Sequence, residues 1–492
     1  MTIARNAILN LAGHAAPLFA ALFLVPALVA RLDAGRFGFL SLAWILVGYF
    51  SLFDLGLGRA LSRLVAERSD AARAAELPVL SRTALSLTFA LGAAAGALLF
   101  AAAGPVCTRL LNLPAELQGE AIIALRILAL CLPLVTLTAA LRGLLEGGQR
   151  FGWVNAMRIP LGVLTFAAPL AAAIAAPGLV SLAVSLALVR VVALVAHWTV
   201  CARLYPELTA IGVPTRSAAR EMLGFGAWLT VSNIVGPLLV YLDRFVIGAL
   251  LAVSAVAYYT APYEVITRLW LVPAALTGVL FPAFAASDRA LLLARYRTGI
   301  KAVLAAIFPL AVGGALFAAQ WLEAWLGAEY ANQGAWAAKL LCIGVLLNCL
   351  AYLPFTLLQA RGRADLVAKT HLAELPFYLV LLAVTVPAYG IAGAALAWAL
   401  RCAGDAAALF WLAHRRVLPG EVVLSGPQSA VIALALGAVA GSLWPGTPEA
   451  RWIYAAVIAC VFAPLIWLVL FNRDDRDMAR SPLAWLRGAR DA

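Results

Sequence analysis

Eleven ionisable residues lie in stretches of the chain that are otherwise apolar, and these side chains could carry chemistry. A guanidinium group matches the oxygens of a phosphate in pairs, and a carboxylate beside it can take up and release a proton. Each such group costs at least about 2.5–3.5 kcal/mol at membrane depth, so each one retained needs a reason. The candidates for binding diphosphate or sugar are Arg59, Arg126, Arg190, Arg244, Arg268 and Arg401, and those for coupling or pairing are Asp54, Asp243, Glu264, Glu374 and Asp405.

Two of these carboxylates stand four residues from an arginine, in the pairs Glu264–Arg268 and Arg401–Asp405. This spacing places both charges on one face of a helix, where they can pair. One interpretation is a neutralised structural pair. The other is a pair that faces a water-filled cavity, where the arginine releases its carboxylate to bind diphosphate and the carboxylate takes a proton.

Two arginines, Arg126 and Arg190, have no carboxylate four residues away and are less easily explained as local pairs. Arg126 lies toward the outer end of its predicted helix, where its side chain could reach the lipid headgroups, whereas Arg190 lies near the middle of a helix. Asp54 precedes Gly56 and Gly58. Those glycines fit either a close helix contact or a locally unwound substrate site.

Histidine and cysteine do not form metal-binding patterns in this sequence. The four histidines lack metal-ligand spacing, and none of the seven cysteines forms a CxxC pair. We therefore expect no metal site and no cofactor.

The elements that position these residues are predicted to be membrane-spanning helices. Of the 492 residues 64% are apolar and 12% are charged, and the mean hydropathy is +0.95. No soluble core buries so much apolar surface, so lipid must be the solvent for most of the chain. Stretches of about 20 apolar residues, enough to cross about 30 Å of hydrocarbon, lie at 8–30, 37–62, 80–104, 119–145, 153–175, 178–202, 221–249, 253–285, 299–321, 334–360, 366–387, 390–413, 427–445 and 452–471.

The predicted loops alternate between those rich in basic residues and those with few. With the N-terminus in the cytoplasm, inside segments hold about 26 Lys and Arg residues and outside loops about five. This bias predicts that both termini are cytoplasmic, as in a multi-pass protein of the bacterial inner (plasma) membrane. The net charge of +12 is then explained by orientation and by lipid headgroups, so nucleic acid is not an expected partner.

The predicted fold class is an all-α polytopic membrane protein with about 14 transmembrane helices. A polar, proline-containing linker near 203–220 separates two pseudo-symmetric six-helix lobes, at 1–207 and 208–416, and a C-terminal helix pair with a short tail follows at 417–492. No predicted loop exceeds about 20 residues, which excludes a catalytic domain outside the membrane.

Three stretches resemble the oligosaccharide flippases of the polysaccharide-export type, which belong to the multidrug/oligosaccharidyl-lipid/polysaccharide exporter superfamily. They are the opening NAILNLAGHAAP…VPALVARLDAGRFGFLSLAW, the stretch GYFSLFDLGLGRALSRLVAE (48–67) with its Asp54-Leu-Gly-Leu-Gly58-Arg59 motif, and YLDRFVIGALLAVSAVAYYTAPYE (241–264). The resemblance covers helices 1–2 and 7–8 well and the rest only through helix count and layout.

This resemblance implies that the protein moves undecaprenyl-diphosphate-linked oligosaccharide from the cytoplasmic to the periplasmic face by alternating access. The substrate would serve surface polysaccharide or lipopolysaccharide biosynthesis, and the protein itself would not be an enzyme. The implied partners are the lipid-linked oligosaccharide, membrane lipids, polysaccharide polymerase and chain-length proteins.

Two other functions compete with a flippase. A cation-coupled multidrug exporter of the same superfamily is expected to have twelve helices and a cavity of aromatics and carboxylates, whereas the many intramembrane arginines here favour an anionic lipid-linked substrate. A membrane glycosyltransferase, ligase or polymerase is expected to carry a large outer loop with a convergent acid–base set. No predicted outer loop here exceeds about 15 residues.

Overall fold

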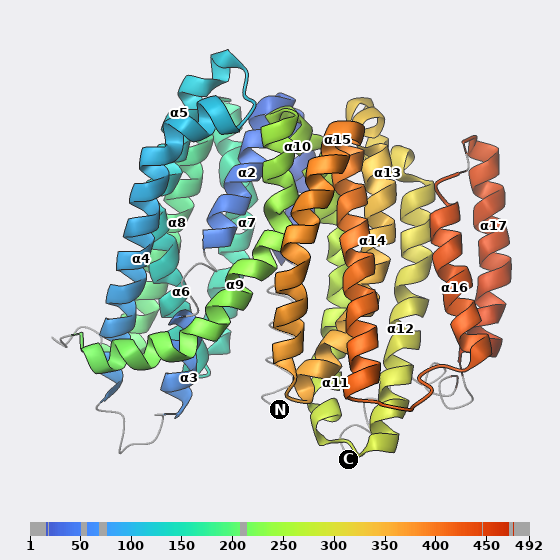
Figure 1. Ribbon diagram of the computed structural model, residues 1–492. Coiled ribbons are helices and arrows are strands. Elements are labelled where there is room, and N and C mark those ends of the chain that lie inside the picture. Colours follow the sequence, from blue (N-terminus) through green and yellow to red (C-terminus); the bar gives the residue numbers. More distant parts are fainter. Residues whose placement is uncertain are drawn as a thin grey trace. The chain divides into compact units, whose positions relative to one another are not determined.

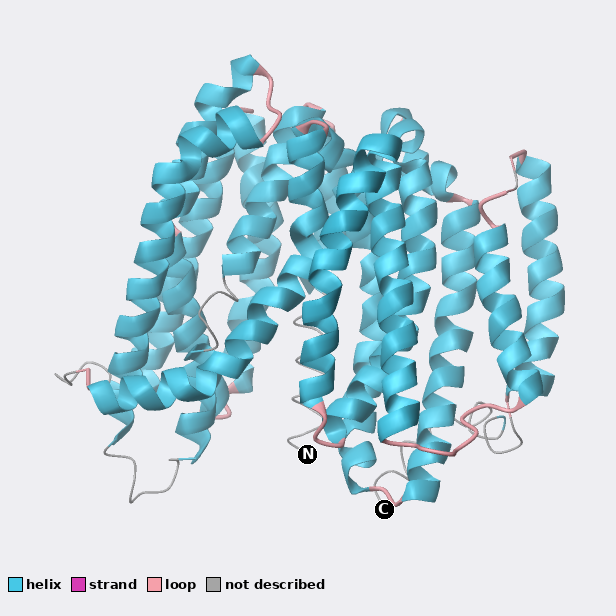
Figure 2. Cartoon of the chain, in the orientation of Figure 1, coloured by secondary structure: helices cyan, strands magenta, loops and turns pink. Residues whose placement is uncertain are grey.

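The described parts of the chain are helices joined by short loops (Figures 1 and 2). The computed structural model describes residues 16–17, 19–50, 57–67, 76–206, 214–444, 446–471 and 476. Within these ranges nine helices are long and apolar enough to cross a membrane, and three shorter apolar helices accompany them. The predicted all-helical membrane fold is confirmed for the described residues, whereas the count of about 14 spans stays a prediction.

Contacts divide the chain into two compact units, Met1–Thr260 and Ala261–Ala492, with the boundary inside α10. The predicted lobe boundaries after residues 207 and 416 stay a prediction. The first unit contains the helix Phe19–Val29, α2 (Ala34–Phe50), α3 (Leu57–Glu67), α4 (Leu77–Pro105) with the π-helical turn η2 (Val106–Leu110), α5 (Ala115–Leu130), α6 (Leu132–Gly147), α7 (Phe151–Ala175), α8 (Leu179–Leu204) and α9 (Arg216–Leu250).

The second unit begins within α10 (Val253–Ile266). Its other elements are the 3₁₀ turn η4 (Thr267–Trp270), α11 (Leu271–Ala286), α12 (Arg289–Leu316), α13 (Ala318–Leu326), α14 (Ala328–Ala360), α15 (Ala364–Arg416), α16 (Gly426–Gly441) and α17 (Pro448–Leu465) with η5 (Ile466–Leu470).

Helix α15 is a hairpin of two antiparallel arms that turns at Gly390. This glycine has φ 60° and ψ −138°, which interrupts the helix and which a residue with a side chain adopts only with strain. Just beyond the turn, the Thr385 hydroxyl donates a hydrogen bond of 2.8 Å to the Gly393 carbonyl. A Cβ atom at Gly393 would lie 1.9 Å from the Thr385 carbonyl oxygen. The two arms therefore begin in direct backbone contact, and they match the predicted spans 366–387 and 390–413.

In the first unit, two glycines bring α3 and α6 together. A Cβ atom at Gly143 of α6 would lie 2.2 Å from the carbonyl oxygen of Gly58 in α3. Around this contact, leucines such as Leu61 and Leu144 form a buried core that Met222 of α9 joins. Gly58, the last glycine of the Asp-Leu-Gly-Leu-Gly motif, is thus a packing residue, as the close-contact interpretation expected.

Gly143→Ala is predicted to destabilise the first unit, because the new methyl group meets backbone that cannot move without separating α3 from α6. Overpacking of this kind costs roughly 1–3 kcal/mol. Thermal unfolding of the purified protein in detergent should show a lower Tm. Gly104→Ala is the matched control, since a Cβ atom at Gly104 meets no other atom within 4 Å. Equal Tm values for the two variants would contradict the predicted close contact.

Candidate functional site

The α15 hairpin gathers a buried ionic cluster in the second unit. Glu374 comes from the first arm, and Arg401 and Asp405 come from the second. The distance from Arg401 Nη1 to Glu374 Oε2 is 3.4 Å. The carboxyl groups of Glu374 and Asp405 lie within hydrogen-bonding reach of each other. All three residues are at most 9% exposed, so the hairpin encloses two carboxyl groups and one guanidinium.

Two further side chains complete this cluster. His371 lies one turn before Glu374, with its Nε2 atom 3.7 Å from Asp405 Oδ1, and its ring stacks on Phe355 of α14. The guanidinium of Arg401 lies over the ring of Tyr378 at 5.6 Å. A possible acid–base group and an aromatic face therefore flank the three charges.

The charges of this cluster do not balance unless it holds a proton. Two ionised carboxylates, one guanidinium and a neutral imidazole leave one excess negative charge. Among the described residues, Glu374 Oε1 and Asp405 Oδ1 also lack a hydrogen-bond donor. A buried acceptor without a donor costs about 1–3 kcal/mol. One proton shared within the cluster would remove the excess charge and supply a donor, so the arrangement is chemically suited to binding a proton.

The sequence located this cluster only in part. It placed Arg401 and Asp405 on one helical face, but the ion pair formed by Arg401 is with Glu374 across the hairpin. It also missed His371 and Tyr378. The sequence did hold a signal for them: His371 lies three residues before Glu374 and Tyr378 lies four residues after it, and residues with this spacing share a face of a helix.

The pair predicted between Glu264 and Arg268 is present, with 2.8 Å between Glu264 Oε2 and Arg268 Nη2. Both side chains are about 40% exposed, so they can reach solvent or a ligand. Beside them, Tyr263 packs against Trp398 of the second α15 arm with 5.4 Å between ring centroids, and Trp270 lies 6.5 Å from the same ring. These aromatic rings connect the segment that carries the half-exposed pair to the arm that carries Arg401.

In the first unit, Asp243 and Arg244 are fully buried. The Asp243 carboxylate lies 3.3 Å from Arg244 Nη1 and accepts a hydrogen bond of 2.5 Å from the Tyr259 hydroxyl. Arg244 also donates to the carbonyl of Val240 at 2.7 Å. Because both charges are enclosed and hydrogen-bonded, this arrangement is typical of a pair that stabilises the fold.

Arg190 is different because no carboxylate of the described residues forms an ion pair with it. It is half-buried in α8, and its hydrogen bond is a 3.4 Å contact from Nη2 to the Thr165 hydroxyl of α7. Thr165 also accepts a hydrogen bond of 3.1 Å at its carbonyl from the Trp44 indole, and Trp44 packs on Phe166. Within the described ranges, the positive charge of Arg190 therefore lies between two helices long enough to span the membrane without a carboxylate partner, beside an aromatic pair.

The remaining predicted residues are not part of these arrangements. Arg126 is exposed on α5, with its guanidinium 5.1 Å from the Phe100 ring centroid, as expected of an arginine that reaches toward headgroups. Arg59 lies in α3, but its side chain is not described. Asp54 lies outside the described residues.

Comparison with known proteins identifies the family. A family model described as polysaccharide biosynthesis protein matches residues 28–333. The chain belongs to this family. A protein named "Putative O-antigen transporter" from Shigella flexneri is 30% identical over 431 residues, which are 84% of this chain and 98% of that protein. Of the stretches that predicted membership, those with the Gly58 motif and Asp243-Arg244 lie within the matched range, whereas NAILNLAGHAAP (6–17) lies before it.

Solved structures of two transporter groups share the fold of this family member. Lipid II flippase MurJ in an inward closed conformation aligns with a TM-score of 0.72 and 11% identity over 94% of this chain and 99% of that chain. A multidrug resistance MATE family transporter in an inward-facing conformation aligns with a TM-score of 0.66 and 16% identity over 82% and 96% of the two chains. The chain therefore has the fold of the MOP superfamily. The named relatives are transporters or flippases, not enzymes.

Proposed function

We propose that this protein is a flippase that moves undecaprenyl-diphosphate-linked oligosaccharide from the cytoplasmic to the periplasmic face of the bacterial inner membrane. Membership of the polysaccharide biosynthesis family and the likeness to the O-antigen transporter support this proposal. The single structural observation that carries it is Arg190, a cation in a membrane helix whose partner in the described residues is a threonine hydroxyl.

Arg190 is proposed to bind the diphosphate of the substrate. A charged side chain at this depth costs at least about 2.5–3.5 kcal/mol, and a diphosphate would offset the cost with opposite charge and paired oxygens. Thr165 holds the guanidinium in place from α7 while leaving its other nitrogens able to donate. Arg59 and Arg268 stay candidates for further phosphate contacts. Arg126, Arg244 and Arg401 are weaker candidates, because Arg126 is exposed against the Phe100 ring and the other two are buried in networks.

Transport is proposed to proceed by alternating access. Proteins of similar fold have been solved in inward-facing and outward-facing conformations. The TM-score of the outward-facing one is 0.58 at 16% identity. Because proteins of this fold adopt both inward-facing and outward-facing conformations, they support an alternating-access cycle for this protein.

The α15 cluster is proposed to couple this cycle to protons. It contains two carboxyl groups, one guanidinium and a histidine in a buried place, so gain or loss of one proton changes its net charge between zero and one negative. A charge that appears in a low-dielectric interior can shift the balance between two conformations by several kcal/mol. Asp54, Asp243 and Glu264 stay further candidates for coupling.

The proposed orientation has both termini in the cytoplasm, supported by about 26 basic residues in inside segments against about five in outside loops. A flippase of this kind would act with polysaccharide polymerase and chain-length proteins, which use the substrate after it crosses the membrane.

A multidrug exporter is the second candidate, favoured by the fold shared with MATE transporters. The sequence relative and the family model point to polysaccharide instead. The two functions differ in their cargo, so a direct assay of cargo separates them.

Arg190→Gln is predicted to abolish surface polysaccharide when it replaces the wild-type gene in its host. Glutamine keeps a hydrogen bond to Thr165 feasible but removes the charge that attracts diphosphate. Surface glycan and undecaprenyl-diphosphate-linked oligosaccharide on the cytoplasmic face should be measured together in cells with equal protein levels. Losing about 1.4 kcal/mol of binding or more weakens substrate affinity at least about tenfold, so lipid-linked units should accumulate on the cytoplasmic face.

Arg126→Gln is the matched control for this experiment, because it removes an arginine of the same unit that is exposed and lies over the Phe100 ring. Normal glycan in Arg190→Gln would contradict the role of Arg190. Normal glycan in a complete gene deletion, together with increased sensitivity to cationic drugs, would contradict the flippase itself and favour the exporter.

Glu374→Gln is predicted to make transport insensitive to the pH difference across the membrane, because the remaining carboxylate and guanidinium balance without a proton. Substrate flipping should be compared in proteoliposomes with and without an imposed pH difference. Asp365→Asn at the start of the same helix is the control, since Asp365 is exposed and pairs with Arg363 and Lys369. Retained dependence on the pH difference in Glu374→Gln would rule out coupling through this cluster.

A further inference from the structure

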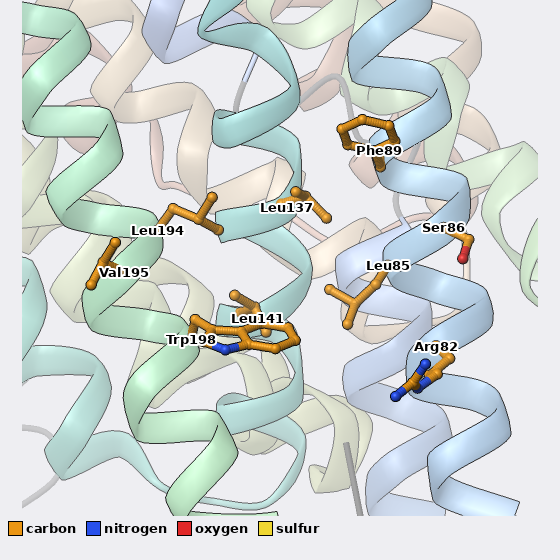
Figure 3. A pocket seen from close by; sticks show the side chains of 9 residues that line it. All are labelled: Arg82, Leu85, Ser86, Phe89, Leu137, Leu141, Leu194, Val195 and Trp198. Carbon is orange, nitrogen blue, oxygen red and sulfur yellow. The ribbon is translucent and has the colours of Figure 1, made fainter. Parts of the chain in front are cut away.

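An apolar groove of about 660 Å³ lies among α4, α6 and α8 of the first unit. Figure 3 shows its lining side chains, which come from all three helices. The walls are formed by residues such as Leu85, Leu137 and Leu194, and the polar groups of the lining are Arg82 and Ser86 of α4 and the indole N–H of Trp198. The groove is therefore amphiphilic, with a cation in a lining that is otherwise almost entirely hydrocarbon.

The groove opens to the outside of the unit. Phe89, Val195 and Trp198 line it and are 52%, 54% and 43% exposed. Because these exposed apolar residues belong to helices that are long and apolar enough to cross a membrane, the groove is suited to lipid acyl chains. In Figure 3 the guanidinium of Arg82 lies near the level of the Trp198 indole, while Phe89 lies farther along the groove.

Further arginines lie close to the Arg82 end. The backbone N–H of Thr215 donates a hydrogen bond of 3.3 Å to the hydroxyl of Thr83, the residue next to Arg82. Thr215 caps the start of α9, so Arg216 follows it directly, and Arg220 comes one turn later. Both of these arginines are exposed. In Figure 1 the first turns of α9 run across the ends of the neighbouring helices instead of along them.

We propose that this groove is a binding site for an anionic phospholipid of the phosphatidylglycerol type. Its phosphate would pair with Arg82, supported by the positive charge of Arg216, and one acyl chain would lie along the leucines. Charge complementarity decides the headgroup, since arginines near the membrane surface attract anionic lipids. The lining offers few polar groups, the side chains of Arg82 and Ser86 and the indole N–H of Trp198, which suits a small headgroup and not an oligosaccharide. Arg190 is not among the residues that line the groove, and the site does not depend on the proposed transport function.

Native mass spectrometry of the full chain tests this site. Purified protein in detergent would receive phosphatidylglycerol or phosphatidylethanolamine, and the lipid retained per protein would be counted. We expect the wild type to retain phosphatidylglycerol in preference to phosphatidylethanolamine. Arg82→Gln should bind phosphatidylglycerol about tenfold more weakly, because it loses a charge-assisted hydrogen bond worth about 1.4 kcal/mol or more. Arg109→Gln should bind it as the wild type does. Arg109 is an exposed arginine in η2, at the opposite end of α4.

Leu137→Trp provides a second variant, because it fills the groove and leaves every charge in place. It should also reduce phosphatidylglycerol retention. Equal retention of the two lipids by the wild type, or unchanged retention in both Arg82→Gln and Leu137→Trp, would overturn the proposal. Displacement of phosphatidylglycerol by an equimolar amount of undecaprenyl phosphate would also overturn it, and would assign the groove to the polyprenyl substrate instead.

Discussion

The hydrocarbon core of a membrane contains no water that could stabilise a charge, and the placement of every ionisable side chain in this protein depends on that constraint. Asp243 and Arg244 neutralise each other in a fully buried network. The α15 cluster is nearly balanced and needs one proton to become neutral. Arg190 is not balanced by any carboxylate of the described residues. This ranking separates charges that hold the fold from those available for function, and it supports the proposed substrate site at Arg190.

Backbone packing makes the balanced arrangements feasible. The turn at Gly390 and the contact between Gly393 and Thr385 bring the two arms of α15 close enough for residues 27 positions apart, Glu374 and Arg401, to pair. In the first unit, the contact between Gly58 and Gly143 joins α3 to α6 in a similar way. Small residues at such crossings let helices approach closely in lipid, where the hydrophobic effect does not hold them together. The glycines of these helices thus act indirectly on the chemistry, by fixing the distance between charged side chains.

Much of the fold could be predicted from the sequence, because apolar run length and basic-residue bias are local properties. The arms of α15 appeared as separate spans at 366–387 and 390–413, and the pair Glu264–Arg268 followed from its spacing within one turn. The partner of Arg401 could not be predicted in this way, since Glu374 lies in the other arm and spacing along one helix says nothing about contacts between helices. The contact of His371 with Asp405 likewise exists only after the hairpin forms, although the spacing of His371 from Glu374 along one helix was visible in the sequence. Thr215 beside Thr83, which brings further arginines near Arg82, is a tertiary contact of the same kind.

The central claim is that this chain itself carries a diphosphate-linked sugar lipid across the membrane. The most direct measurement places purified protein in liposomes whose inner leaflet contains a lipid-linked oligosaccharide, and follows the exposure of the sugar to a glycosidase added outside. The account predicts that the accessible fraction rises with time in wild-type proteoliposomes and stays at the level of protein-free liposomes with Arg190→Gln. Equal accessibility in wild-type and protein-free liposomes, with protein shown to be folded and inserted, would contradict it.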